Sequence, residues 1–583
     1  MVEKGTDNSL CGKKIVPLEE AVSRGIRPGM AIHLNTGAYA SALVREVIRQ
    51  YLGKDAGFTV VSSGVTTPYE IGLACSGLVK HVITTNHSYT YPTPRPIPML
   101  QEMHKKGLIG IEDWSLYSLE QRLMAGALGM GFLPTKSLVG TSLGEDNAHA
   151  FTMMDDPFGS GQKVGAVKAL VPDISLIHGC VADPEGNLIL SPPYFTSIWG
   201  ARASKEGAIA TVEKIVSREF IKKHSALVKV PGNLVKFLCP VPFGAHPQGL
   251  AAESIGVCEG YREDYGFIKS FVERSQDTQD FKEWLEEWAV RCRDQEEYLR
   301  KLGQERVESL KWKGSRQVSD RPETGHNGKA AAAKECNETQ RMILAAAKKI
   351  KAIVETKNYN AVLAGIGSPG LAAWLAYYLL REEDKEVLLL TGLGQVGFSP
   401  RPGDPFLMSL ENVMDCTFLT DTVEVYGTLV GGAHNRCLSI IGTAQVDQYG
   451  NLNTVKIDKT PLIGVGGAGD AINACESLVV TRQSKKRFMK RVPYVGCSGQ
   501  RIRTLVTDLG VFEKLDDKGV FTLTQVVGDS SSGRTMEDRI ARIRRECGWD
   551  LSISGNVTEI PPPTMKELSL LNRLDPEGLF LKR

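Results

Sequence analysis

Residues 173–188 (DISLIHGCVADPEGNL) and 438–452 (LSIIGTAQVDQYGNL) repeat one another at a distance of half the chain. Each begins with an apolar run typical of a buried strand and passes through a bend of small residues. Asp183 and Asp447 then occupy the same place, and each is followed after two variable residues by Gly-Asn-Leu. Asp and Asn side chains bond nearby backbone and Gly accepts positive φ, so both sites are predicted to be structural turns. The repeat indicates two related halves.

The segments upstream of each repeat also follow one order. A helix, a strand, a small-residue loop and a second helix are predicted at residues 17–25, 30–34, 35–38 and 39–51, and again at 338–356, 360–364, 365–370 and 371–380. Each unit continues into an apolar stretch that ends in glycine, residues 58–64 (FTVVSSG) and 387–394 (VLLLTGLG). Strands that alternate with helices indicate βαβ units and a parallel sheet.

These patterns predict an α/β protein of two homologous domains, each an open, mainly parallel sheet with flanking helices. Residues 311–334 are polar, contain Gly, Pro and Ser, and are predicted to be a linker. The domains are then 1–310 and 335–583. The first is expected to end in a helical extension, because residues 277–310 carry aromatic side chains at helical spacing. This extension would pack on its own domain or on a neighbour.

The composition is that of a globular enzyme. The chain has 583 residues, 42% apolar and 23% charged, which excludes a disordered chain and allows roughly three to four domain-sized units. A net charge of +2 argues against nucleic acid as the main partner. Glycine is the one residue in excess: 59 of the 583 residues, about a tenth, are glycine, against a usual share of about 7%. Many tight loops are therefore expected.

The N-terminus, the apolar runs and the cysteines indicate the compartment of the protein and whether it binds a metal. Residues 1–10 are polar, and no run approaches 18 apolar residues, so neither a signal peptide nor a membrane helix is expected. The 12 cysteines are scattered, without a CxxC pair or a Cys/His cluster. We expect reduced thiols, a cytoplasmic protein and no metal site.

Three motifs could bind a ligand. The loop at 365–370 follows a strand and opens a helix, where backbone N–H groups bind an anion or oxyanion, unless the loop serves only tight packing. Residues 462–474 (LIGVGGAGDAINA) would let a long, thin ligand lie against backbone, or form a plain turn. The basic residues in 484–491 are a phosphate clamp or a solvated face.

Taken together, these motifs resemble the class I coenzyme A transferases, most closely the glutaconate CoA-transferase type. In that family α and β subunits share one NagB/RpiA-like fold, and here they look fused in one chain. The α-like stretches are 131–136 (GFLPTK), 140–141 and 172–187, and the β-like stretches are 365–369, 441–453, 464–468, 486–489 and 574–581.

The resemblance implies CoA transfer between an acyl-CoA thioester and a small carboxylic acid, through a glutamyl thioester. CoA would be a substrate, with no permanently bound cofactor, no nucleic-acid or membrane partner, and a homo-oligomer, dimer or higher, as the assembly. The implied oxyanion loop is Gly365, Gly367 and Ser368, and the implied CoA-binding residues are Gly464, Gly466, Gly467, Ala468, Lys486 and Arg487.

The sequence departs from the family at the catalytic glutamate, whose expected position falls at Leu390 or Thr391. Gln395 could instead hydrogen-bond a substrate carbonyl. The other candidates are general bases for water, Glu112, Glu145 or Asp146, unless these are ordinary exposed carboxylates, and the thiols Cys416 and Cys437, unless these are buried and inert. The alternatives to transfer are an acyl-CoA hydrolase or C–C-cleaving lyase, and a non-catalytic acyl-CoA binder.

Overall fold

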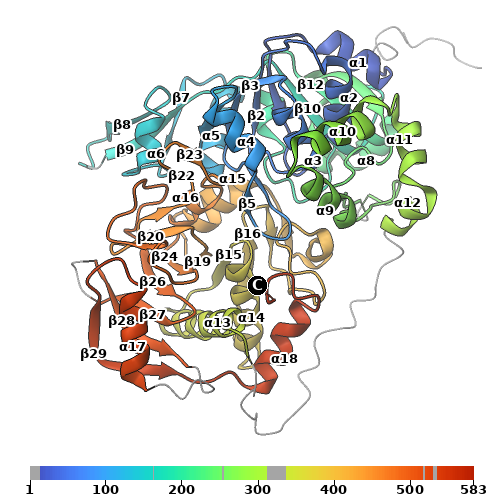
Figure 1. The fold of residues 1–583 in the computed structure, drawn as a ribbon. Coiled ribbons are helices and arrows are strands. Elements are labelled where there is room, and N and C mark those ends of the chain that lie inside the picture. Colours follow the sequence, from blue (N-terminus) through green and yellow to red (C-terminus); the bar gives the residue numbers. More distant parts are fainter. Residues whose placement is uncertain are drawn as a thin grey trace, which may run out of the picture.

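The structure, a computed structural model, describes residues 14–161, 163–252, 255–311, 336–515, 519–528 and 535–582. Figure 1 shows two lobes, the first half of the chain (blue to green) above the second half (yellow to red). Apart from Lys311, the linker expected at 311–334 lies outside the described residues. No described helix is both long and apolar enough to cross a membrane.

The first lobe is built on a nine-stranded sheet. Its parallel part has the order β14-β12-β10-β1-β2-β3-β6. These strands are β14 (Val235–Pro240), β12 (Ala208–Ile215), β10 (Ile174–Ala182), β1 (Ala31–Leu34), β2 (Phe58–Ser62), β3 (Val79–Thr84) and β6 (Gly110–Asp113). The short strands β11 (Leu188–Ile189) and β13 (Val228–Val230) join it in antiparallel fashion.

The second lobe is built on a ten-stranded sheet. Its parallel part has the order β26-β24-β19-β15-β16. These strands are β26 (Ile502–Val506), β24 (Glu476–Val480), β19 (Cys437–Ile441), β15 (Ala361–Ala364) and β16 (Leu388–Thr391). Next to β16, the sheet continues with two antiparallel strands, β17 (Gln395–Val396) and β18 (Phe418–Leu419). Next to β26, it continues with the antiparallel strands β27 (Gly510–Lys514) and β28 (Phe521–Val527). The last strand at this edge, β29 (Ser552–Ile560), pairs with β28 in parallel.

The two lobes share one topology. The order β14-β12-β10-β1-β2 corresponds strand by strand to β26-β24-β19-β15-β16, and all of these pairs are parallel. The turns after β10 and after β20 (Gln445–Asp447) also match. Asn187 N and Nδ2 donate to Asp183 at 2.9 and 2.8 Å, and Asn451 N and Nδ2 donate to Asp447 at 3.0 and 3.1 Å. The two-domain α/β fold is confirmed, and both Asp-Gly-Asn sites are structural turns.

The helices predicted next to β1 and β15 are present. They are α1 (Leu18–Gly25) and α2 (Ser41–Tyr51) in the first lobe, and α13 (Glu338–Lys357) and α14 (Ser368–Arg381) in the second. Helix α13 begins at a capping box between Asn337 and Gln340 and ends at Asn358, which adopts the left-handed conformation. Its apolar face packs on α14 and on the sheet of the second lobe. Local sequence therefore specifies where these helices begin and end.

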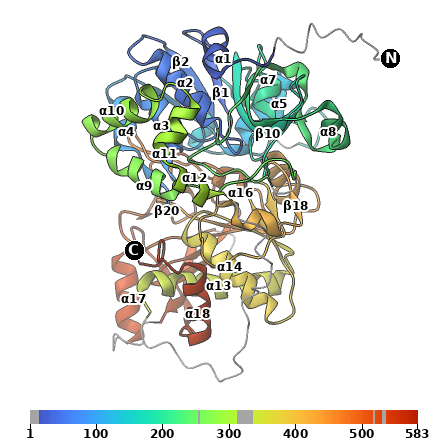
Figure 2. The same cartoon turned by 90° about the vertical axis from the view of Figure 1, so that its right-hand side faces the viewer.

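The helical extension of the first lobe consists of α9 (Tyr265–Arg274), α10 (Thr278–Leu285), α11 (Gln295–Leu302) and α12 (Gln304–Leu310). Trp284 and Tyr298 are fully buried against Tyr69 of α3 (Pro68–Cys75). The Tyr69 hydroxyl donates to the Tyr298 hydroxyl at 3.1 Å. The extension therefore packs on its own lobe, beside α2 and α3 (Figure 2).

Backbone hydrogen bonds join the two lobes around the glycine-rich loop at 462–468. Gly466 N donates to Thr85 O at 2.8 Å, and Leu116 N donates to Gly466 O at 3.1 Å. Nearby, the buried carboxylate of Asp470 accepts hydrogen bonds from two serine hydroxyls and one backbone N–H of the first lobe, Ser115 Oγ (2.7 Å), Ser137 Oγ (2.6 Å) and Tyr117 N (2.9 Å). These bonds hold the facing surfaces of the lobes in one arrangement.

Candidate active site

A cavity of about 470 Å³ lies between the two lobes. The first lobe contributes the residues that follow β2 and β3, together with the hairpin of β4 (Ser88–Tyr89) and β5 (Arg95–Pro96). This blue hairpin reaches toward the lower lobe in Figure 1. The second lobe contributes the ends of β15, β16 and β19 and the loop at 462–468. Ligand sites of parallel sheets lie beyond the carboxyl ends of their strands, and this volume is typical of a ligand pocket.

All three glycines predicted to contact CoA line this cavity. They are Gly464, Gly466 and Gly467, and with them lie Ala468 of the same loop and Gly365 of the loop after β15. Gly464 has φ +84°, and a Cβ atom on it would lie 2.3 Å from Thr85 O. Gly464 is thus required by the contact between the lobes, and the loop that it shapes forms one wall of the cavity.

A second, more open cavity of about 240 Å³ adjoins the first, and Arg487 and Thr443 line both. Gly367 and Ser368 line it at the N-terminus of α14, which has no side-chain cap. Arg482 lines it as well. Partial desolvation and the charge of Arg482 lower the pKa of Arg487. Two guanidinium groups and a helix N-terminus make this end of the site suited to an anion.

Lys486, which was predicted to contact the same phosphates, has an exposed side chain and lines neither cavity. Arg482, five residues before Arg487, was missed. The basic cluster that begins at residue 484 was the available signal, and extending it by two residues would have included Arg482.

The end of β16 faces the large cavity through Gly392 and Leu393. Leu390 and Thr391, where the resemblance places a glutamate, are 1% and 0% exposed and are not among the lining residues. A Cβ atom on Gly392 would lie 2.3 Å from the hydroxyl oxygen of Tyr426, which also lines the cavity. The strand-end position that faces the ligand space is therefore Gly392, and a side chain there would overlap Tyr426.

Both halves of the chain are similar to known proteins. Residues 16–239 match the family described as "Coenzyme A transferase". One of the two subunits of the glutaconate CoA-transferase of Acidaminococcus fermentans is 28% identical over 321 residues, which are 51% of this chain and 94% of that subunit. The other subunit of the same enzyme is 26% identical over 249 residues, which are 39% of this chain and 91% of that subunit.

Residues 16–239 of the chain belong to the coenzyme A transferase family. Both kinds of subunit are represented in one polypeptide of about twice the subunit length. The fold is shared with an acyl-CoA transferase from Escherichia coli O157:H7, whose apoenzyme structure superposes with a TM-score of 0.62 at 15% identity and covers 100% of this chain and 98% of its own.

Gln395 lies outside both cavities. Its side chain is 0% exposed, and Nε2 donates to Ser409 O at 3.2 Å. Gln395 Oε1 is buried and has no hydrogen-bond partner among the described residues. A contact with a substrate carbonyl would require this side chain to leave the interior.

The predicted bases also lie outside the cavities. Glu112 on β6 pairs with Arg122 (3.0 Å) and His149 (3.2 Å). Burial raises the pKa of Glu112, but hydrogen bonds from His81 and Trp114 and the charge of Arg122 outweigh it and lower the pKa to about 2. Such a carboxylate is a weak base at neutral pH. Glu145 is exposed, and Asp146 pairs with Lys456.

The two candidate thiols, the buried Cys437 and the partly buried Cys416, are protonated at neutral pH. Burial raises the pKa of Cys416 and of Cys437 to about 12. Because the thiolate is the reactive form, neither is activated for nucleophilic attack at neutral pH.

The site is bordered by one carboxylate, Glu263, that was not among the residues predicted from the sequence. Glu263 lines a hollow of about 70 Å³ that adjoins the large cavity and shares Thr66 and Phe195 with it. Leu410 N donates to Glu263 Oε1 at 3.1 Å. Burial, together with the charge of Asp404, raises the pKa of Glu263 to about 8. No sequence motif surrounds this residue, and only the packing of the extension brings it here.

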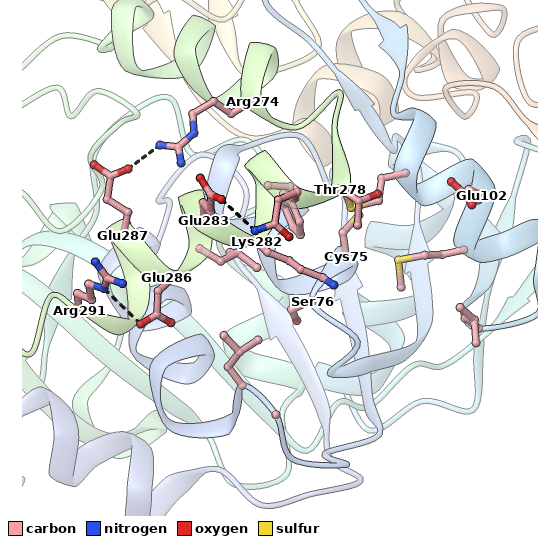
Figure 3. A pocket seen from close by; sticks show the side chains of 18 of the residues that line it. Cys75, Ser76, Glu102, Arg274, Thr278, Lys282, Glu283, Glu286, Glu287 and Arg291 are labelled. Atoms are coloured by element: carbon pink, nitrogen blue, oxygen red, sulfur yellow. Dashed lines mark hydrogen bonds and ion pairs between the residues drawn. The ribbon is translucent and has the colours of Figure 1, made fainter.

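A hollow of larger volume, about 1140 Å³, lies elsewhere, between α4 (Pro98–Lys105) and the helical extension. Figure 3 shows charged side chains of its wall paired with each other, Arg274 with Glu287 and Arg291 with Glu286. None of the predicted site residues lines it. We therefore place the active site at the cavity between the lobes.

Proposed function

We propose that the enzyme transfers CoA between an acyl-CoA thioester and a small carboxylic acid at the cavity between the lobes. The observation that carries this proposal is the junction of two cavities, one suited to anions, with Arg482, Arg487 and the α14 N-terminus, and a glycine-walled one of about 470 Å³. CoA has matching parts, charged phosphates joined to a thin, neutral arm. The arm would lie along the loop at 464–468, with the thioester near Gly365 and Gly392.

The exchange needs a carboxylate that attacks the thioester carbonyl carbon. The C–S bond breaks, CoA leaves as a thiolate, and a mixed anhydride forms. The thiolate then attacks the other carbonyl of the anhydride, which gives the new thioester and releases the first acid. By family resemblance, the backbone N–H groups next to Gly365 would stabilise the oxyanions, because Gly365 lines the large cavity while Gly367 and Ser368 line the anion cavity. The described lining residues of the large cavity include no carboxylate, so the attacking group is the acceptor acid itself or Glu263 of the adjoining hollow. Glu263 would attack in its ionised form, which its raised pKa of about 8 makes the minor form at neutral pH. In that case the new thioester forms on Glu263, and the acceptor acid then repeats both steps on it.

Hydrolysis or C–C cleavage of the acyl-CoA is a second candidate function, favoured by the glycine at the end of β16. Gly392 is the strand-end residue that faces the cavity, and no carboxylate stands at the neighbouring Leu390 or Thr391, where the resemblance places the nucleophilic glutamate. Hydrolysis or C–C cleavage of the acyl-CoA needs no enzyme carboxylate at this position.

The test incubates the protein with a panel of acyl-CoAs, with and without acetate or a dicarboxylic acid, and follows products by mass spectrometry. CoA on the added acid supports transfer, free CoA without an acceptor supports hydrolysis, and loss of CO₂ supports C–C cleavage. Borohydride reduction after acyl-CoA treatment labels an enzyme carboxylate. A labelled peptide containing Glu263 assigns the nucleophile, and an unlabelled protein that still transfers CoA assigns direct attack by the acceptor.

We also propose a cytoplasmic homo-oligomer, dimer or higher, that carries no permanently bound cofactor. The described cysteines are all free thiols, which is usual in a reducing compartment. Light scattering on the purified chain measures the assembly, and a mass spectrum of the denatured protein's released small molecules tests for a cofactor.

A further inference from the structure

Tyr426 reaches the large cavity between two glycines. A Cβ atom on Gly392 would lie 2.3 Å from Tyr426 Oη, and a Cβ atom on Gly467 would lie 2.0 Å from it. All three residues line the cavity. The hydroxyl therefore fills the space that side chains at positions 392 and 467 would need.

The Tyr426 hydroxyl is an available hydrogen-bond donor. Only 6% of the residue is exposed, and no described residue forms a hydrogen bond with this hydroxyl. Buried tyrosine hydroxyls usually have a partner, so an unpaired one at a cavity wall is suited to a ligand acceptor. Burial and the charge of Asp470 raise the pKa of Tyr426 well above its usual range, so the group keeps its proton at neutral pH.

The backbone that carries Tyr426 is tied to the end of β16. Tyr426 lies in a π-helical turn, η6 (Val425–Val430), directly after α15 (Thr422–Glu424). Thr422 Oγ1 donates to Gly392 O at 2.9 Å, which joins the start of this helix to the strand end. π-Helical turns are rare and recur at functional sites. The ring and Gly392 are thus positioned by the same contacts.

We propose that Tyr426 donates a hydrogen bond to the thioester carbonyl oxygen of the bound acyl-CoA and stabilises the oxyanion that forms when this carbonyl is attacked. The inference rests on the proposed function, because it assumes a thioester in this cavity. At the strand end where the resemblance leads one to expect a nucleophilic carboxylate, the enzyme presents a glycine and a neutral hydroxyl donor. The group activates the electrophile and forms no covalent bond with it.

The kinetic test is Tyr426→Phe, which removes only the hydroxyl. We expect kcat to fall about 10²- to 10³-fold, as for the loss of one oxyanion donor, with KM for the acyl-CoA nearly unchanged. The matched control is Tyr377→Phe, because Tyr377 is similarly buried (7% exposed) but bonds Ser399 and Arg381 and lines neither cavity. An unchanged kcat in Tyr426→Phe, or a change confined to KM, overturns the proposal.

A binding test separates this inference from the proposed function. The probe is a ketone analogue of acetyl-CoA in which a methylene group replaces the thioester sulfur, so it cannot be turned over. Infrared spectra of the ¹³C-labelled carbonyl should show a lower stretching frequency on wild-type protein than on Tyr426→Phe. Such a shift without turnover of any acyl-CoA supports Tyr426 and refutes transfer. Equal frequencies refute Tyr426 alone, and failure of the analogue to bind wild-type protein refutes both.

Discussion

Replacing Arg487 with methionine removes the one charged side chain that lines both the large cavity and the anion cavity. The guanidinium now makes two long hydrogen bonds through Nη1, to Thr443 O at 3.3 Å and to Thr481 Oγ1 at 3.5 Å. Its other donors remain for a ligand. The neighbouring charge of Arg482 lowers the pKa of Arg487, so a phosphate bound in this cavity would relieve the repulsion between the two arginines.

The expected loss of CoA affinity depends on how far the Arg487 side chain is exposed to solvent. A hydrogen bond to a charged group contributes about 1.5–3 kcal/mol. The Arg487 side chain is open to solvent, which screens its charge, so the lower end of this range applies. A loss of about 1.5 kcal/mol weakens CoA binding roughly tenfold. Because the interaction is ionic, the loss should shrink as the salt concentration rises.

Calorimetric titration with CoA and with pantetheine, which has no phosphate, measures this loss. Arg487→Met should weaken binding of CoA and leave pantetheine binding unchanged. Lys486→Met is the matched control, because it removes the same charge from the adjacent residue, whose side chain lines neither cavity. An equal loss for CoA and pantetheine, or an equal effect of Lys486→Met, would refute the assignment of this cavity to the phosphates.

Three further predictions concern stability and coupling. Gly392→Ala should lower the melting temperature because its Cβ would overlap Tyr426 Oη, and adding Tyr426→Phe should restore part of the loss; independent, additive effects would contradict the close packing. Burial raises the pKa of Asp470 to about 6. As the pH rises from about 4 to 6, the unfolded protein loses this proton while the folded protein still holds it, so the free energy of unfolding falls. Asp470→Asn should remove that slope, about 3 kcal/mol over the window in chemical denaturation, and an unchanged slope would rule out the assigned titration. Glu112→Gln should destabilise the first lobe by about 3–5 kcal/mol because Arg122 is left buried without its partner, while kcat of the folded fraction stays at the wild-type value; a loss of kcat at full stability would show that Glu112 acts in the chemistry.

Much of the fold was predictable because it depends on local patterns. The helices α1, α2, α13 and α14 and the strands β1, β2, β15 and β16 lie within a few residues of their predicted bounds. Their signals are apolar periodicity, caps and glycines, which act over a few residues of chain. The repeat of Asp183 and Asp447 also predicted the shared topology, since equal turns join equal strands.

The candidate site was predictable only in part. The glycines of the loop at 464–468 and Gly365 were identified from the sequence, because a backbone that must approach another surface closely requires glycine. The carboxylates Glu112 and Glu145 were equally visible in the sequence, yet they lie outside the cavities. In the sequence, a carboxylate residue looks the same whether its side chain faces a cavity, an arginine or solvent.

The sequence by itself determined the two-fold repeat, the α/β class and the glycine loops, because each is encoded in neighbouring residues. Only the tertiary structure decided that Gly392, not Leu390 or Thr391, faces the ligand space, and that Tyr426 fills the volume beside it. It also brought Glu263 from the first lobe to a hollow beside this cavity. These relations depend on distances between atoms far apart in the chain, and no local pattern records such distances.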